Sequence, residues 1–296
     1  MRQSIFEGSG AALATPMDSR GNLDLGAMGR LLERLIEEGT DAVIVNGTTG
    51  ESATLDDREK LAVIEFVIRR VDGRIPVIAG TGSNCTKHAV ELSKEAEKLG
   101  ADALLQVTPY YNKTSQEGLV RHFTQVGDHV GIPMLLYNVP SRTGVAIEPE
   151  TYRVLSEHPR IIGTKEAGGN LSMIAKTAAL CGGGFDIYSG NDDQTVPVMA
   201  LGGKGVISVL ANLMPRQMHE MCRLFLDGNV KESRKMQLEL LELMEALFWD
   251  VNPIPVKAAL SIMGVCEDSC RLPLIPMEPG QKKKLEALMR RSRASL

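Results

Sequence analysis

The sequence lacks any long apolar run. No stretch approaches the roughly 20 consecutive apolar residues that a helix needs to cross a membrane. The first ten residues, MRQSIFEGSG, also lack the apolar core of a signal peptide. We therefore expect a cytoplasmic protein that does not span a membrane.

Cysteine and histidine are scarce, at five residues each. The cysteines are odd in number and scattered along the chain, which fits reduced thiols better than a disulfide framework. Cys266 and Cys270 have a spacing that can pair on a helix, but no histidine or further cysteine lies near them to complete a metal site. We expect no bound metal.

An excess of positive charge is missing too. The chain has 33 Lys and Arg against 37 Asp and Glu, a net charge of -4. Proteins that bind nucleic acids or anionic membranes normally carry a basic patch. With 296 residues, 43% of them hydrophobic, the chain is long enough to bury a large core. Small metabolites are therefore the expected ligands.

One alternating pattern of segments repeats along most of the chain. Short apolar, β-branched runs alternate with longer amphipathic segments, the pattern of βα units around a parallel sheet. Eight runs have the character of strands: residues 10–16, 41–47, 75–82, 101–109, 133–140, 161–167, 185–191 and 205–212. Eight strands, each followed by a helix, predict an α/β protein with a (β/α)8 TIM barrel, since doubly wound open sheets more often stop at five or six strands.

The eighth unit is complete near Asn229. Beyond it, residues 231–249, 255–264 and 281–296 continue with helical spacing and no further strand pattern. We therefore expect a catalytic barrel domain at residues 1–229 and a C-terminal helical extension at residues 230–296.

Polar residues follow several predicted strands, at the end of the barrel where active sites of this fold lie. Each has a purely structural interpretation: Thr48 or Ser52 can cap a helix, the tyrosines at 110, 111 and 137 can be rim aromatics, and Arg142 can be a solvated charge. Alternatively, the turn at 47–52 holds a carboxylate with its amides. A tyrosine hydroxyl then relays protons, and the Arg142 guanidinium grips a substrate carboxylate.

Lys165 lies inside the apolar run IIGTKEA. A lone ammonium among apolar groups is costly, so either the side chain reaches solvent or its chemistry is used. A lysine attacks a carbonyl only as the free amine, which is scarce at neutral pH unless burial favours it. Both interpretations are open from this strand alone. Tyr137 and Thr48 at neighbouring strand ends favour the second.

The two-residue period of a strand divides this run into two faces. The face that we predict to point into the barrel holds Ile161, Gly163, Lys165 and Ala167. The face that we predict to point towards the helices holds Ile162, Thr164 and Glu166.

Five segments, in this order and at this spacing, resemble the dihydrodipicolinate synthases, also called 4-hydroxy-tetrahydrodipicolinate synthases, of the N-acetylneuraminate lyase superfamily of pyruvate-dependent class I aldolases. They are GTTGES, VTPYYN, LLYNVPSRTG, GTKEA and NPIPVK. The resemblance implies a lyase of lysine and diaminopimelate biosynthesis. Lys165 would form an imine with pyruvate, with no other cofactor. The enamine would attack L-aspartate 4-semialdehyde, and ring closure would give 4-hydroxy-tetrahydrodipicolinate.

The resemblance also implies a proton relay. Tyr137 would be the phenol closest to the imine, passing protons through Thr48 to Tyr111. In this family the last tyrosine is lent by the neighbouring subunit. A shared tyrosine requires at least a dimer, and the family is usually a homotetramer built from two dimers.

Substrate-binding residues follow from the same resemblance. Thr49 would hold the pyruvate carboxylate, and Arg142 would help to bind the semialdehyde. Gly190 and Ile207 match positions whose backbone lines the pocket.

Two alternatives are open at this point. The first is a sister aldolase, either an N-acetylneuraminate lyase or an aldolase of 2-keto-3-deoxy sugar acids. These relatives keep the lysine and the tyrosine that correspond here to Lys165 and Tyr137. Arg142 and the YYN segment at 110–112 favour the synthase over them. A non-catalytic binding paralogue would be expected to have lost Lys165 or Tyr137.

A possible allosteric pocket is the last feature that the resemblance implies. In lysine-inhibited relatives it lies at the dimer interface, and the corresponding positions here are Ser52, Ala53, Asp57, Lys60, Asn84, His88 and Tyr110. Inhibited members usually carry histidine at the position of Asp57 or Lys60 and glutamate at that of His88. Losing a carboxylate and adding an ammonium disfavours a cationic ligand. We expect inhibition by lysine to be weak or absent.

Overall fold

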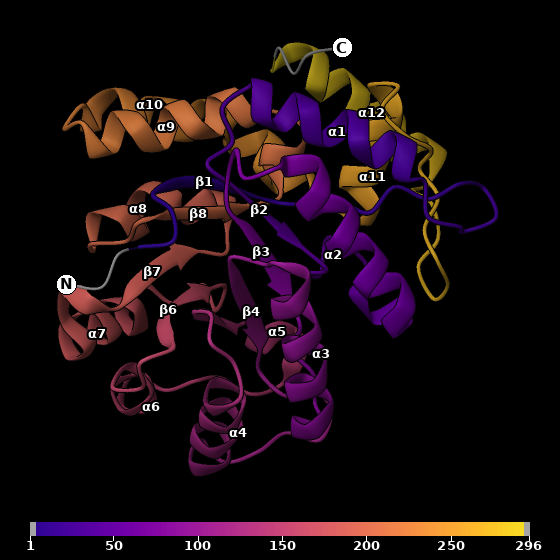
Figure 1. Cartoon of the computed structure of the whole chain (residues 1–296). Coiled ribbons are helices and arrows are strands. Elements are labelled where there is room, and N and C mark those ends of the chain that lie inside the picture. The colour runs from indigo at the N-terminus through magenta and orange to yellow at the C-terminus, as the bar shows by residue number, and fades with distance from the viewer. Residues whose placement is uncertain (1–3, 293–296) are drawn as a thin grey trace.

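The computed structural model describes residues 4–292 and shows a closed barrel of eight parallel strands (Figure 1). The strands pair in chain order, and β1 closes the barrel against β8. Their bounds are β1 Gly8–Ala12, β2 Ala42–Val45, β3 Val77–Gly80, β4 Ala103–Val107, β5 Met134–Asn138, β6 Ile161–Glu166, β7 Asp186–Ser189 and β8 Gly205–Ser208. The prediction of a (β/α)8 barrel is confirmed.

Helices follow every strand. They are α1 Leu25–Glu37, α2 Asp57–Val71, α3 Thr86–Leu99, α4 Gln116–Asp128, α5 Pro140–Thr143, α6 Pro149–Ser156, α7 Leu171–Cys181, α8 Thr195–Ala200 and α9 Pro215–Leu226. Short 3-10 turns precede or follow some of them: η1 Ser52–Thr54, η2 Gly182–Gly184, η3 Asp192–Gln194 and η4 Leu210–Asn212.

The N-terminus of α2 shows which residue caps this helix. Asp56 caps this helix in a capping box, in which its carboxylate accepts from the Glu59 amide and the Glu59 carboxylate accepts from the Asp56 amide. The helix-cap interpretation of Thr48 and Ser52 is therefore wrong for α2.

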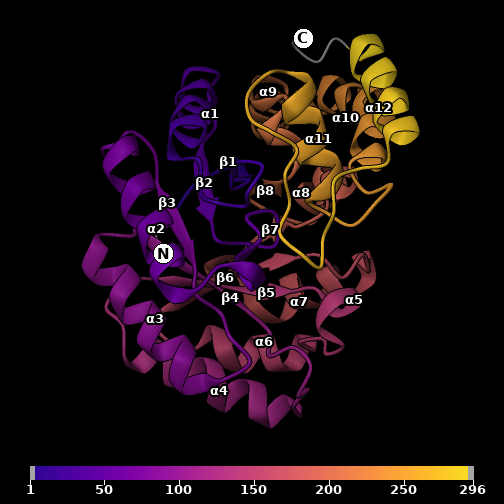
Figure 2. The same cartoon turned by 90° about the vertical axis from the view of Figure 1, so that its right-hand side faces the viewer.

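The C-terminal extension consists of α10 Val230–Ala246, α11 Ile254–Ile262 and α12 Pro279–Arg291. Figure 2 shows these helices grouped with α9 on one side of the barrel, with α12 beside α11. Helix α10 begins at Val230, next to the boundary that we place at residue 229. Because α10 also packs against α8 and α9 of the barrel, the division into two domains stays a proposal.

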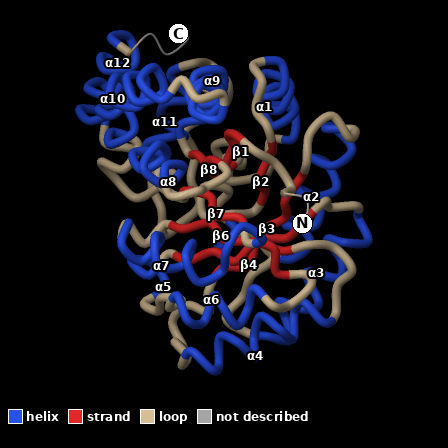
Figure 3. Tube along the Cα trace, turned by 90° about the vertical axis from the view of Figure 1, so that its left-hand side faces the viewer, coloured by secondary structure: helices blue, strands red, loops and turns tan. Residues whose placement is uncertain are grey.

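The barrel interior is filled by one side-chain cluster, inside the ring of helices that surrounds the strands in Figure 3. Small and branched residues from all around the barrel contribute: Ala12, Ala42, Ile44, Ile78, Ala103, Leu105, Leu135, Ile162 and Ile207. At the N-terminal end of the strands, the Phe6 ring stacks on Tyr188 with centroids 4.4 Å apart. Tyr188 Oη donates to the Phe6 carbonyl at 2.6 Å.

Strand β6 departs from simple alternation at its start. Met134 of β5 is opposite Ile161, but the next residue, Leu135, is opposite Gly163, so Ile162 is an inserted residue. Consequently Ile161 packs in the outer cluster and Ile162 in the inner one. The predicted faces of these two isoleucines are wrong.

Beyond the irregularity, the predicted faces of β6 are confirmed. The Lys165 amine lies over the Tyr137 ring of the inner cluster, and Ala167 packs against the same cluster. Thr164 and Glu166 both bond to Tyr152 of α6, in the helical layer.

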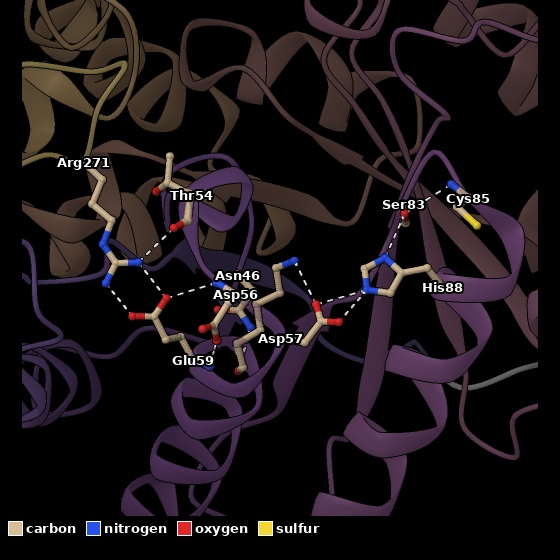
Figure 4. A network of polar contacts seen from close by, with 10 residues as sticks. Asn46, Thr54, Asp56, Asp57, Glu59, Ser83, Cys85, His88 and Arg271 are labelled. Carbon is tan, nitrogen blue, oxygen red and sulfur yellow. Dashed lines mark hydrogen bonds and ion pairs between the residues drawn. The ribbon is translucent and has the colours of Figure 1, made fainter.

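The C-terminal extension contacts the loop after β2 and holds it in place. Lys257 of α11 and Glu51 of this loop form an ion pair whose side chains are both fully buried. The second Glu51 oxygen accepts from the Arg271 amide at 3.0 Å. The Arg271 guanidinium also bonds to the Thr54 carbonyl at 2.8 Å and to the Glu59 carboxylate (Figure 4). The loop is thus held from outside the barrel.

Within residues 4–292, every helix is too short or too polar to cross a membrane.

Replacing Lys257 by methionine is expected to lower the free energy of unfolding by about 3–5 kcal/mol, because the Glu51 carboxylate would stay buried without its cation. The double variant Lys257→Met/Glu51→Gln should recover part of this loss. Urea-induced unfolding followed by circular dichroism measures both. As a control, Lys235→Met removes an ion pair with Glu239 whose side chains are 74% and 61% exposed, and it should cost less than about 1 kcal/mol. A Lys257→Met variant as stable as the unmodified chain would contradict the expectation.

Candidate active site

Lys165 and Tyr137 are direct neighbours on adjacent strands. They are opposite each other in the register of β5 and β6, and the Lys165 Nζ atom lies 4.5 Å from the centroid of the Tyr137 ring. Each residue is only 6% exposed. Among residues 4–292, no carboxylate lies within ion-pair distance of this Nζ. The amine therefore meets an aromatic face rather than an anion.

This pair has the parts that imine chemistry needs. A buried amine that is not held by a carboxylate can attack a ketone carbon, and a phenol next to it can pass protons to and from the oxygen that leaves as water. The interpretation of Lys165 as a solvent-reaching structural charge does not fit its burial.

Asp192 supplies a buried carboxylate on the same end of the barrel. It begins η3, directly after β7, and its Oδ2 accepts from the amides of Val209 at 3.1 Å and Leu210 at 2.9 Å. Burial raises the pKa of Asp192, and hydrogen bonds together with the positive charge of Lys165 oppose that rise. Asp192 thus fixes the turn after β8.

The loop after β2 carries Thr48 and Thr49. Asn46 and Glu51 adopt left-handed backbone conformations, with φ of 55° and 53°, and turn the chain sharply on either side of the two threonines. Thr49 is 2% exposed, and its Oγ1 accepts from Asn252 Nδ2 at 3.0 Å. Thr48 is half-buried.

Asn252 connects two of the predicted binding residues. Besides its bond to Thr49, its carbonyl accepts from Arg142 Nη2 at 3.4 Å. Arg142 is exposed and belongs to α5. Sequence reasoning gave Asn252 no role, although it lies in the NPIPVK segment. Its contact with Thr49 joins residues 203 positions apart, and no local pattern encodes such a pairing.

Gly190 and Ile207 lie at the ends of β7 and β8. The Gly190 amide donates to the Glu166 carbonyl at 2.6 Å. A Cβ at Gly190 would lie 2.7 Å from Ala167 Cβ and 2.9 Å from the Glu166 carbonyl oxygen, so only glycine fits. Ile207 is fully buried in the inner cluster. Their part in substrate binding stays a prediction.

Tyr111 does not join the other relay residues within one chain. It lies in the loop after β4 with φ of 70° and is 91% exposed. In the described part of the chain, no hydrogen bond links its hydroxyl group to Thr48 or Tyr137. The relay from Tyr137 through Thr48 to Tyr111 stays a prediction that needs a second subunit.

The predicted allosteric residues form two separate groups of contacts. In the first, His88 Nε2 lies 2.9 Å from Asp57 Oδ2, and Lys60 Nζ lies 3.3 Å from Asp57 Oδ1. Figure 4 shows the His88 ring between Asp57 and Ser83. In the second, Asn84 Nδ2 donates to the Tyr110 carbonyl at 3.1 Å. Ser52 and Ala53 lie nearby in sequence, on η1.

Asp57 is the carboxylate of this group. Burial tends to raise its pKa, but the His88 ring and the Lys60 ammonium outweigh burial and hold the pKa below its usual value. The carboxylate of this group thus lies on α2 and is already paired, while α3 carries His88; the expectation of weak or absent inhibition by lysine stays a prediction.

No group of three or more His, Cys, Asp and Glu side chains suited to a metal ion occurs within residues 4–292.

Comparison with known proteins agrees with this geometry. The chain matches the model of the Dihydrodipicolinate synthetase family over residues 5–292. It is 53% identical over 277 residues to the 4-hydroxy-tetrahydrodipicolinate synthase of Acetivibrio thermocellus, covering 94% of each chain.

Solved structures agree as well. The crystal structure of dihydrodipicolinate synthase from Aquifex aeolicus superposes with a TM-score of 0.96 at 45% identity, covering 98% of this chain and 99% of that one. A structure of the first monomeric dihydrodipicolinate synthase variant has the same TM-score of 0.96 at 42% identity, with 98% of both chains covered. By sequence, fold and the lysine–tyrosine pair in the barrel, the chain belongs to the dihydrodipicolinate synthetase family.

Proposed function

We propose that this protein is a 4-hydroxy-tetrahydrodipicolinate synthase, which condenses pyruvate with L-aspartate 4-semialdehyde through an imine on Lys165. The observation that carries the proposal is the buried Lys165 amine over the Tyr137 ring, with no carboxylate paired to it among the described residues. The covalent imine takes the place of a cofactor. We place the reaction in the cytoplasm, on the biosynthetic route to diaminopimelate and lysine.

The chemistry follows from the geometry. Lys165 Nζ attacks the keto carbon of pyruvate, and water leaves with protons that Tyr137 handles. Loss of a proton from the methyl group gives an enamine, whose carbon attacks the aldehyde. Attack of the substrate's own amino group on the imine carbon then closes the ring and frees Lys165.

Substrate binding is assigned to the loop after β2 and to α5. The Thr49 hydroxyl and amide would hold the pyruvate carboxylate, and Arg142 would hold the carboxylate of the semialdehyde. Asn252 contacts both residues, which supports a role for the C-terminal extension in keeping the two carboxylate sites at a set distance. Gly190 and Ile207 would line the space between them.

Tyr111 would complete the proton relay from a partner subunit. Its 91% exposure in the single chain and its position next to Tyr110, which is 40% exposed, are consistent with a residue that projects into a neighbour. We propose at least a dimer, assembled further into a tetramer.

Borohydride reduction in the presence of pyruvate should attach one pyruvate-derived group to Lys165, located by peptide mass mapping. Lys257 is equally buried but is paired with Glu51, so it should remain unmodified and serves as an internal control. Lys165→Gln should give no adduct and no turnover. An adduct elsewhere, or none, would remove the proposed mechanism.

The choice of second substrate separates the synthase from its sister aldolases. L-Aspartate 4-semialdehyde should be consumed by the pyruvate-loaded enzyme at least about 100-fold more efficiently than N-acetylmannosamine or glyceraldehyde, because Arg142 suits a carboxylate and a sugar needs other polar groups. Comparable kcat/KM values for a sugar aldehyde would favour a sister aldolase instead.

Mixing two inactive variants tests the shared tyrosine. Lys165→Gln and Tyr111→Phe chains, refolded together, form mixed dimers in which one of the two sites has both native residues. Activity should return to about a quarter of the native value for random pairing. Mixing Lys165→Gln with Tyr137→Phe is the control: both residues belong to one chain, so no mixed dimer restores a site. Equal behaviour of the two mixtures would contradict a shared Tyr111.

Lysine at millimolar concentration should inhibit weakly or not at all, because Asp57 is already bound by His88 and Lys60, and Lys60 repels a cationic ligand. The double variant Asp57→His/His88→Glu moves the carboxylate to α3 and should increase inhibition at least about 10-fold over the native chain. Initial rates against lysine concentration measure both. Strong inhibition of the native chain would disprove the expectation.

A further inference from the structure

We propose that Glu166 is a positioning residue for Lys165 and Tyr137, holding the ends of β5, β6 and α6 together from behind the catalytic face. The inference rests on the proposed function, because it assigns Glu166 to the same imine chemistry. Glu166 itself touches neither the reacting atoms nor the barrel interior.

The strand register places Glu166 directly behind the catalytic pair. Tyr137 is opposite Lys165, and the next residues, Asn138 and Glu166, are opposite each other. Successive strand residues point to opposite faces. Tyr137 and Lys165 therefore meet inside the barrel, and Asn138 and Glu166 meet on its outer surface, one residue further along.

Glu166 is bonded to both neighbouring elements. Asn138 Nδ2 lies 3.1 Å and 3.2 Å from the two carboxylate oxygens, and the Tyr152 hydroxyl of α6 donates to one of them. Tyr152 Oη also lies 3.0 Å from Thr164 Oγ1, two residues before Glu166. All of these side chains are at least nine-tenths buried, so no solvent competes with the bonds.

The bonds extend to the loops that surround the site. Asn138 Oδ1 accepts from the Ile147 amide at 3.1 Å, which fixes the segment that follows α5 and Arg142. The Glu166 carbonyl accepts from the Gly190 amide at 2.6 Å, on the neighbouring strand. A change at Glu166 would therefore move several site elements at once.

The donors around Glu166 match its ionised form. Burial raises the pKa of Glu166 to about 7. The Tyr152 hydroxyl, the Asn138 amide and the Gly168 amide donate to the carboxylate and act in the opposite direction, lowering the pKa. A proton on the carboxyl group would have to displace a donor, so Asn138 and Tyr152 bind best when Glu166 is charged.

Two further titratable groups near Glu166 have pKa values that burial moves away from neutrality. Burial raises the pKa of Tyr152 well above its usual range. Cys181 of α7, beyond Tyr152, also has its pKa raised by burial, with Arg153 acting in the opposite direction. Lys165 lies on the other face of β6. Compared with Tyr152 and Cys181, Glu166 is the group whose pKa lies near 7.

The proposal predicts a specific change in kinetics. Glu166→Gln should lower kcat about 10- to 100-fold, because a small displacement of a nucleophile from its proton-transfer partner is enough for such a loss. KM for pyruvate should stay within about 2-fold, since Thr49 is unaffected. The rise of native kcat with pH, centred near the pKa of Glu166, should be absent in this variant.

Tyr152→Phe provides a second, independent readout. It removes a donor that stabilises the carboxylate, so the pKa of Glu166 should rise further and the acidic limb of the kcat profile should move to higher pH. A purely structural defect would lower activity without moving this limb. If Glu166→Gln does not fold, the shift of the acidic limb in Tyr152→Phe still tests whether Glu166 positions Lys165 and Tyr137.

Gln106→Met is the matched control. Gln106 is a fully buried polar residue of β4 that donates to Thr81 Oγ1 at 2.6 Å and to Ser93 Oγ at 2.9 Å. It has the same kind of buried hydrogen bonds, but none of them goes to Asn138 or Tyr152 among the described residues. Its loss should reduce stability while leaving kcat and its pH profile unchanged.

Stability should respond to pH in a stated direction. The pKa of Glu166 is higher in the folded chain, about 7 against a usual 4.5, so the folded state binds the proton more tightly. The Glu166 contribution to the free energy of unfolding is therefore largest below about pH 4.5 and is lost as pH rises towards 7. This pH dependence should be weaker in Glu166→Gln, measured by urea unfolding.

Two results would overturn the proposal: kcat and pH profile of Glu166→Gln equal to those of the native chain, or a Tyr152→Phe profile that does not shift. Failure of the proposed function itself is distinguishable, since the native chain would then give no borohydride adduct on Lys165. An adduct on native Lys165 with unchanged variant profiles rejects the role of Glu166 alone.

Discussion

Burial of the Lys165 amine without a carboxylate partner is the constraint on which the other features of the site depend. A strong ion pair would hold an amine in its charged, unreactive form. In the barrel the Lys165 amine lies over the Tyr137 ring instead, 4.5 Å from its centroid, at the carboxyl end of the strands. The polarisable ring of Tyr137 thus takes the place that a counter-ion would otherwise have beside the amine.

Buried carboxylates lie close to Lys165 in the fold, but they are bonded to other parts of the structure. Glu166 follows Lys165 directly in sequence yet faces the helical layer, and Asp192 is directed towards the amides after β8. The two-residue period of a strand makes this separation possible within a single peptide bond. Glu51, a further buried carboxylate, is paired with Lys257. Each of these three carboxylates is thus bonded to a group other than Lys165, although the Asp192 Oδ1 atom is buried without a hydrogen-bond partner within residues 4–292.

Much of this arrangement could be predicted from sequence, because the number of strands, their approximate positions and the faces of Lys165 and Glu166 depend on local patterns. The strand ends were less accurate: the first strand, predicted at 10–16, is Gly8–Ala12, and the eighth, predicted at 205–212, ends at Ser208. What failed was non-local. The irregularity at Ile162 leaves no trace, since Ile161 and Ile162 are both apolar and either fits either face. The link from Asn252 to Thr49 spans 203 residues. Asp57 and His88 were both named from the sequence, but their pairing depends on the packing of α2 against α3, which no local pattern encodes.

The contacts of the C-terminal extension also bear on how the chain matures during synthesis. The loop with Thr48 and Thr49 leaves the ribosome early, but its partners Asn252, Lys257 and Arg271 are among the last residues to emerge. Until then Glu51 lacks its cation, and a nascent barrel holds an unfinished loop. Because chains fold progressively from the N-terminus, the loop after β2 gains these contacts only when translation is nearly over, and a chain truncated before Asn252 would carry Lys165 without them.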